Sequence, residues 1–137
     1  MHNGRRKGGL RMRKSFGFTL LVVGATVLGA PSAHAFGMSF SWGPTKKCFD
    51  SKSPPITLSA VPKETVKVRF RMVDLDAPGY PHGGGTVAHS GKGQIAYGAF
   101  RYKGPCPPSP HTYTITAEAL DAKGKVIAKA SARKRFP

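Results

Sequence analysis

The sequence predicts an all-β domain, most simply a small antiparallel sandwich of six or seven short strands. Two segments, Thr65–Asp74 and His111–Leu120, alternate apolar and polar residues with a period of two, which is typical of half-buried strands. The 17 glycines and 12 prolines of the chain break the rest of it into short pieces. No segment after the N-terminal region shows the apolar spacing of a helix, so a purely β domain is the expected fold class.

Each element follows from the same signals. In Thr65–Asp74 the apolar positions alternate with basic ones, which predicts one buried and one charged face. Four further segments favour strands: Phe36–Gly43, Ile56–Ala60, Gln94–Tyr102 and Lys125–Ala132, the last returning from a hairpin turn at Asp121–Gly124. We expect loops at Pro44–Pro55, Asp76–Gly93 and Tyr102–Tyr113, and a basic tail at Arg133–Pro137.

Residues 1–35 have the pattern of a secretory signal peptide. Six basic residues precede an apolar run at Phe16–Ala30, and Ala33-His34-Ala35 has the form of a cleavage site. The alternative is a retained membrane anchor, for which the run is short and glycine-rich. We therefore predict a mature domain of residues 36–137 (137 − 35 = 102 residues) that is periplasmic or secreted.

The exported part is strongly basic. Removing six cations from the formal charge of +16 leaves 16 − 6 = +10, because all six acids lie after residue 35. Such a charge favours anionic partners such as lipid head groups, polyanions and small phosphorylated or carboxylated molecules. The alternative is that the charge serves only solubility.

The only two cysteines, Cys48 and Cys106, both lie in the exported part. Two cysteines in an exported domain predict one disulfide, and two separate thiols are the alternative. The chain has no Cys-x-x-Cys, so neither a thioredoxin-type site nor a zinc knuckle is supported.

Three short motifs carry residues suited to binding. Asp74 and Asp76 are two apart where the best strand ends, so both can face the same way, or serve only as turn residues. His82 precedes three glycines, whose amides can approach an anion, although an exposed loop histidine is the alternative. His111 and Tyr113 share a strand face and combine a titratable ring with a hydroxyl, or are ordinary edge and core residues.

Catalytic and metal chemistry find little support in the sequence. Ser109 has no base placed beside it by spacing, and no Gly-x-Ser-x-Gly elbow is present. No His-x-His or similar pair supports a metal site, and no cofactor motif occurs. The expectation is a protein that is not an enzyme and that has no cofactor and no metal.

Taken in order, Asp74-Leu75-Asp76-Ala77-Pro78, His82, Gly104-Pro105-Cys106-Pro107-Pro108 and His111-Thr112-Tyr113 resemble the motifs of the phosphatidylethanolamine-binding protein family. Bacterial members of that family are called Raf kinase inhibitor-like proteins, and the resemblance covers roughly Cys48 to Ala132. It implies a β-sandwich with a pocket for phosphate-like or carboxylate groups at one end. The matching site residues are Asp74, Asp76, Pro78, His82, Gly104, Pro105, His111 and Tyr113.

The chain departs from the family pattern at three places. Leu75 stands where the family has a proline, and Thr112 replaces an arginine, which removes a possible orienting cation. A tight hairpin at Gly124 stands where bacterial members insert a helical segment. The resemblance therefore implies a shallower pocket.

Two functional hypotheses follow. The first is an exported, non-catalytic binding protein for a small anion or phospholipid head group. The second is a structural or interaction module without a pocket, in which the basic strands, the Arg133–Arg135 tail and Pro105–Pro108 contact envelope polyanions or a protein partner. No nucleic-acid partner is expected under either hypothesis.

Overall fold

The computed structural model describes residues 4, 8–9 and 34–137. The predicted signal peptide lies almost entirely outside these residues, so its assignment stays a prediction. Within the described part of the chain, no helix is long and apolar enough to cross a membrane.

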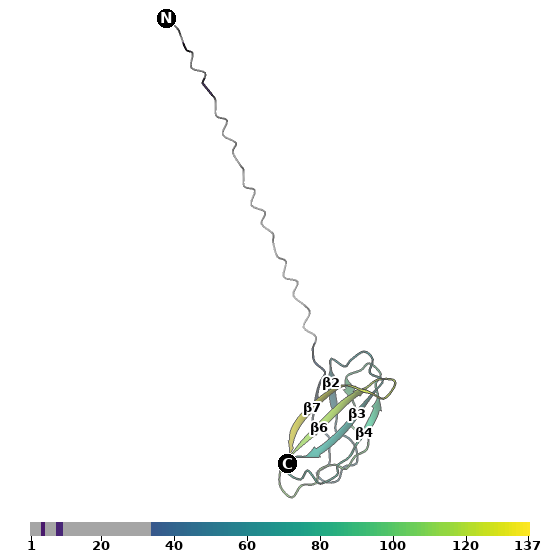
Figure 1. Ribbon diagram of the computed structural model, residues 1–137. Helices are drawn as coiled ribbons and strands as arrows, with labels where there is room; N and C mark the ends of the chain where they lie inside the picture. Colours follow the sequence, from purple (N-terminus) through teal and green to yellow (C-terminus); the bar gives the residue numbers. More distant parts are fainter. Residues whose placement is uncertain (1–3, 5–7, 10–33) are drawn as a thin grey trace. The chain divides into compact units, whose positions relative to one another are not determined.

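Residues 34–137 form two antiparallel sheets (Figure 1). The smaller sheet has the order β1-β2-β5, formed by Gly37–Phe40, Ile56–Ser59 and Gln94–Ile95. The larger sheet has the order β4-β3-β6-β7, formed by Gly84–Ala88, Lys67–Asp74, His111–Leu120 and Val126–Phe136. This arrangement confirms the predicted all-β antiparallel sandwich, and no helix occurs in the part of the chain that the structure describes.

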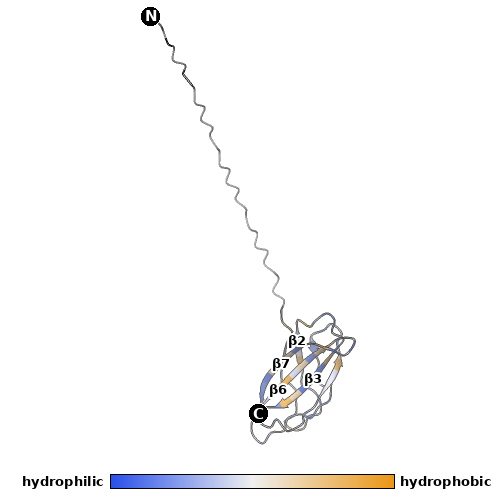
Figure 2. Cartoon of the chain, viewed as in Figure 1, coloured by the Kyte–Doolittle hydropathy of each residue, from blue (hydrophilic) through white to orange (hydrophobic). Residues whose placement is uncertain are grey.

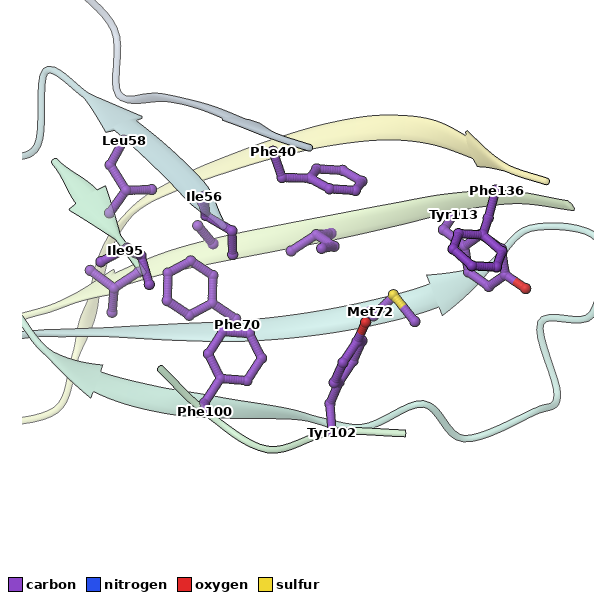
Figure 3. Packing of buried hydrophobic residues seen from close by; sticks show 13 residues of the cluster. Phe40, Ile56, Leu58, Phe70, Met72, Ile95, Phe100, Tyr102, Tyr113 and Phe136 are labelled. Carbon is purple, nitrogen blue, oxygen red and sulfur yellow. The ribbon is translucent and has the colours of Figure 1, made fainter. Parts of the chain in front are cut away.

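The apolar side chains of the two sheets meet in one core, shown in Figure 3. The buried positions of β3 and β6 alternate as expected, with Phe70 opposite Ala117 and Met72 opposite Ile115. Phe70 also stacks on Phe100 with ring centroids 5.1 Å apart. The alternation of apolar residues in the sequence also includes Val66, but Val66 precedes β3 and is 41% exposed.

The expectation of a continuous loop at Asp76–Gly93 is wrong, because β4 forms within it. Gly84 pairs with Arg71 and Gly85 with Phe70, so the glycine run supplies an edge strand. The backbones are close enough that a Cβ at Gly84 would overlap the carbonyl oxygen of Phe70. Strand propensity is poor for glycine, but the close packing here requires it.

The predicted strand at Gln94–Tyr102 is also largely wrong. Only Gln94–Ile95 pairs with β2, and Gly98, at φ +78°, lies in the turn that follows. Phe100 and Tyr102 are nevertheless buried, each 8% exposed. Burial of two aromatic side chains spaced two apart thus produced a strand-like pattern without a strand.

The basic tail expected at Arg133–Pro137 belongs to β7 instead. Arg133 pairs with Thr114, Arg135 with Thr112, and Phe136 with His111. Phe136 is 3% exposed and anchors this end of the strand in the core. The charged residues therefore lie on an ordered sheet face and not on a free tail.

Candidate functional site

The site is organised by a hydrogen bond between an imidazole and a carboxylate at one end of the large sheet. Asp74 is the last residue of β3 and pairs across the sheet with Tyr113, two residues from His111. His111 Nδ1 lies 2.7 Å from Asp74 Oδ2. Because an ionised carboxylate only accepts hydrogen bonds, Nδ1 carries the proton and donates it, which leaves Nε2 of His111 as the free end of the ring.

Asp74 is 3% exposed and its carboxylate is fully hydrogen-bonded. The amides of Asp76 and Ala77 donate to Oδ1 at 2.9 and 3.1 Å, which forms an Asx turn at the end of the strand. Burial alone would raise the pKa of Asp74, but the bonds from His111 and the two amides outweigh it and hold the pKa below its usual value. Asp74 is therefore ionised at neutral pH and fixes the orientation of His111.

His82 enters the same region from the loop that precedes β4. It is 3% exposed, and its Nδ1 lies 2.6 Å from the carbonyl oxygen of Lys103. A carbonyl only accepts, so Nδ1 is again the protonated nitrogen. The other nitrogen, Nε2, is buried and has no hydrogen-bond partner among the described residues. A buried polar atom without a partner is costly and points to a ligand or water.

The ring of Tyr113 is a neighbour of both histidine rings. Its ring centroid is 5.4 Å from that of His82 and 6.4 Å from that of His111. Burial and the neighbouring Asp74 carboxylate raise the pKa of the Tyr113 phenol, so its hydroxyl stays protonated and can donate. Trp42 and Phe136 pack edge-on against this ring, and Figure 3 shows Phe136 beside it. The end of β7 thus positions a site residue.

A disulfide holds one wall of the site. Cys48 and Cys106 lie at disulfide distance with Cα atoms 4.3 Å apart, as predicted. The amide of Gly104 donates to the carbonyl of Asp50 at 2.9 Å, and a Cβ at Gly104 would overlap that oxygen. The glycine is therefore required for the proline-rich segment to lie this close to the connector after β1.

Together these groups surround a cavity of about 230 Å³. Five of the predicted site residues line it: Asp74, His82, Gly104, His111 and Tyr113. Three do not, because Asp76 turns outward to accept the amide of Thr112 at 2.7 Å, Pro105 is packed in the interior, and Pro78 borders another cavity. The ligand-binding role of all eight stays a prediction.

Sequence reasoning missed the apolar rim of the cavity, which consists of Phe49, Ala77, Tyr80, Pro107 and Pro108, with Cys106. Phe49 is 70% exposed and adopts a positive φ of 51°, which is rare for a residue with a side chain. Tyr80 lies against His82 with ring centroids 4.7 Å apart. The sequence feature that could best have pointed to this rim is the position of Phe49 directly after a cysteine of the disulfide.

The donor set is also close to that of a metal site, since ligand atoms of Asp74, Asp76 and His111 lie within 4.8 Å of one another. However, Oδ2 of Asp74 bonds His111, its Oδ1 accepts two amides, and Oδ2 of Asp76 accepts the amide of Thr112. A cation would have to displace these bonds. The three groups are better described as a network that orients an imidazole.

The sandwich with this cavity at one end has the phosphatidylethanolamine-binding protein fold, which confirms the fold class implied by the sequence motifs. Two solved structures share it. One is a candidate phosphatidylethanolamine-binding protein homologue from Chlamydia trachomatis, with a TM-score of 0.54. The other is YbcL of E. coli, described as a member of the mammalian family, with a TM-score of 0.57.

Each of these proteins is 19% identical to the chain, and each alignment covers 75% of the chain and 97% or 98% of the other protein. No protein-family model and no curated protein sequence matches the chain. The likeness to both structures is therefore a likeness of fold.

Proposed function

We propose that the domain is an exported, non-catalytic binding protein of the phosphatidylethanolamine-binding type, which holds a phosphate-like or carboxylate group in the cavity beside His82 and His111. The observation that carries the proposal is the buried, unpartnered Nε2 of His82, a residue that lines the cavity together with His111 and Tyr113. The names of the two similar structures agree with a lipid head group as one source of such a ligand.

The size of the cavity favours a small ligand. Sites for drug-sized molecules measure about 300–1,000 Å³, and this cavity is about 230 Å³. It can accommodate a phosphate, an acetate or a phosphoethanolamine group, whereas the rest of a lipid would lie outside. The exposed rings of Phe49 and Tyr80 at the rim would then face the apolar part of the ligand.

The hydrogen-bond inventory dictates how an anion would bind. Each histidine already donates from Nδ1, to Lys103 or to Asp74, so a neutral ring offers only an acceptor at Nε2. A fully ionised ligand needs donors, which the site gains when the imidazoles take up protons. Binding of an anion that has no hydrogen to donate, such as acetate, is therefore coupled to proton uptake by an imidazole.

The test is calorimetric titration of the mature domain with inorganic phosphate, acetate and phosphoethanolamine, for the parent and for His111→Ala and His82→Gln. We expect each variant to bind about tenfold more weakly or worse, as for loss of one charge-assisted hydrogen bond. His89→Gln is the matched control, because His89 lies outside this cavity. If His111→Ala binds all three anions as the parent does, the site assignment is wrong.

A further inference from the structure

We infer that the outer face of the β4-β3-β6-β7 sheet is a second binding surface, and that it binds a linear acidic glycan. This inference is independent of the cavity beside His82. It depends on how the sheet register places cations, hydroxyls and a single acid on one face.

Two rows of cations run along this face. The exposed outward residues of β3 and β7 are Lys67, Arg69, Arg71, Lys129, Ser131, Arg133 and Arg135, whereas Val73, which also points outward from β3, is half-buried. Six of these seven are basic, and Figure 2 shows hydrophilic colours on β7. Successive cations are two residues apart on β3 and between Arg133 and Arg135 on β7, hence about 7 Å, whereas Ser131 separates Lys129 from Arg133. That spacing suits a chain with regularly placed negative groups.

A line of hydroxyls lies between the rows. Thr112, Thr114 and Thr116 occupy the outward positions of β6, and the register places Thr116 between Arg71 and Ser131. Strands are about 4.8 Å apart, so the two cation rows are about 10 Å apart with the hydroxyls in the middle. Hydroxyls can exchange hydrogen bonds with sugar hydroxyls as well as with sulfate or carboxylate oxygens.

Most of the positive charge on this face is uncompensated. Glu118 is the one acid on the outward positions of these strands, and it is bonded to both Arg69 and Lys129, at 2.6 and 2.8 Å. Among the described residues, Arg71, Arg133 and Arg135 have no carboxylate partner. Asp76 approaches the end of the face, where it accepts the amide of Thr112. Three arginines are therefore free to meet an anionic partner.

At β3 the face deepens into a cavity of about 650 Å³. Arg69, Arg71, Thr116 and Glu118 line it, and the loop from Pro78 to Gly83, which includes Tyr80, forms its other wall. A sulfate or carboxylate of the glycan can enter here and approach Arg71 from a partly enclosed side. The glycan chain would continue across β6 toward Arg133.

The composition of the face distinguishes an acidic glycan from other polyanions. The outward positions of the four strands carry no aromatic side chain on which a nucleobase could stack. None of the exposed large apolar side chains, which are Phe49, Val66, Leu75 and Tyr80, belongs to these strands, and only Tyr80 borders the surface, at the cavity beside β3, so the strands themselves offer no large apolar group for insertion into a bilayer. Cations and hydroxyls on strands whose outward positions carry no aromatic and no large exposed apolar side chain match an acidic sugar chain.

The experiment measures binding of a heparin-derived sulfated oligosaccharide over a range of salt concentrations. Arg71→Gln, Arg133→Gln and Arg135→Gln are combined in one variant. The matched control combines Lys47→Gln, Lys63→Gln and Lys123→Gln, which removes the same charge from exposed loop positions. We expect the face variant to bind about tenfold more weakly or worse, with the slope of log affinity against log salt reduced by about two to three. The control should change affinity far less.

A second pair of variants tests the opposite change, the removal of one acidic residue. Glu118→Gln releases Arg69 and Lys129 and should tighten binding, whereas Glu64→Gln, which removes an acid from an exposed turn, should not. Equal effects of the face and control variants would overturn the inference, because net charge alone would then explain binding. Tighter binding to a single-stranded oligonucleotide of matched charge, or to vesicles of phosphatidylcholine and phosphatidylglycerol in equal parts, would overturn the glycan assignment. Phosphate binding by the cavity variant His82→Gln tests the other site separately.

Discussion

His111 Nδ1 and Asp74 Oδ2 lie 2.7 Å apart, and this hydrogen bond joins the end of β3 to the start of β6. The same carboxylate also accepts the two amides of an Asx turn. One buried side chain therefore closes the sheet end, shapes the loop and orients a ring of the site.

Asp74→Asn should destabilise the domain by about 2–3 kcal/mol, because hydrogen bonds to a buried charge become weaker neutral ones. Urea unfolding measures the change. Asp76→Asn is the control, since Asp76 is exposed and accepts only the amide of Thr112. Equal losses for the two variants would contradict the central role of Asp74.

Acid should destabilise the domain through two buried carboxylates, Asp50 and Asp74. Burial raises the pKa of each carboxylate, but hydrogen bonds outweigh this effect and hold both pKa values below their usual range. Asp50 accepts hydrogen bonds from the amides of Lys46 and Lys52 and from the hydroxyl of Tyr97. Because the pKa is lower in the folded state, the stabilisation is complete above the unfolded value of about 3.9 and is lost as the pH falls through the folded value.

Thermal unfolding between neutral pH and pH 3 checks this prediction. Asp50→Asn and Asp74→Asn should each start less stable than the parent and lose less stability on acidification. Glu64→Gln serves as the control because Glu64 is exposed in a turn. A parent and variants with parallel acid profiles would show that these carboxylates do not carry the linkage.

Reduction of the Cys48–Cys106 pair should cost up to about 4 kcal/mol, because the bond closes a loop across 58 residues of sequence separation. Urea unfolding with and without dithiothreitol measures the loss. Since Cys106 lines the cavity, phosphate affinity should fall as well. The variant Cys48→Ser with Cys106→Ser should reproduce both effects and be insensitive to dithiothreitol; unchanged stability would refute the structural role of the bond.

The sequence predicted the structure well where apolar and polar side chains alternate along a strand. It was misleading where two backbones pack closely together. The period of two in His111–Leu120 predicted β6 to the residue and put His111 and Tyr113 on one face, and the family resemblance of the motifs placed Asp74 with them. By contrast, β4 was missed because Gly84 pairs with Arg71 for lack of a side chain, a packing condition that no propensity records. Pro105 was expected in the cavity wall, but tertiary packing turned it inward.

Proton uptake on anion binding distinguishes the proposed site from a simple electrostatic contact. Because both histidines donate from Nδ1 to protein acceptors, a bound acetate ion, which has no hydrogen to donate, needs a proton on Nε2 of His82 or His111. Acetate affinity should therefore rise as the pH falls from 8 toward 6, and calorimetry in two buffers of different ionisation enthalpy should show protons taken up. In His82→Gln the uptake should decrease, whereas His89→Gln should match the parent. If binding takes up no protons, the imidazoles do not donate to the ligand, and the anion would have to be held by the Tyr113 hydroxyl and backbone amides.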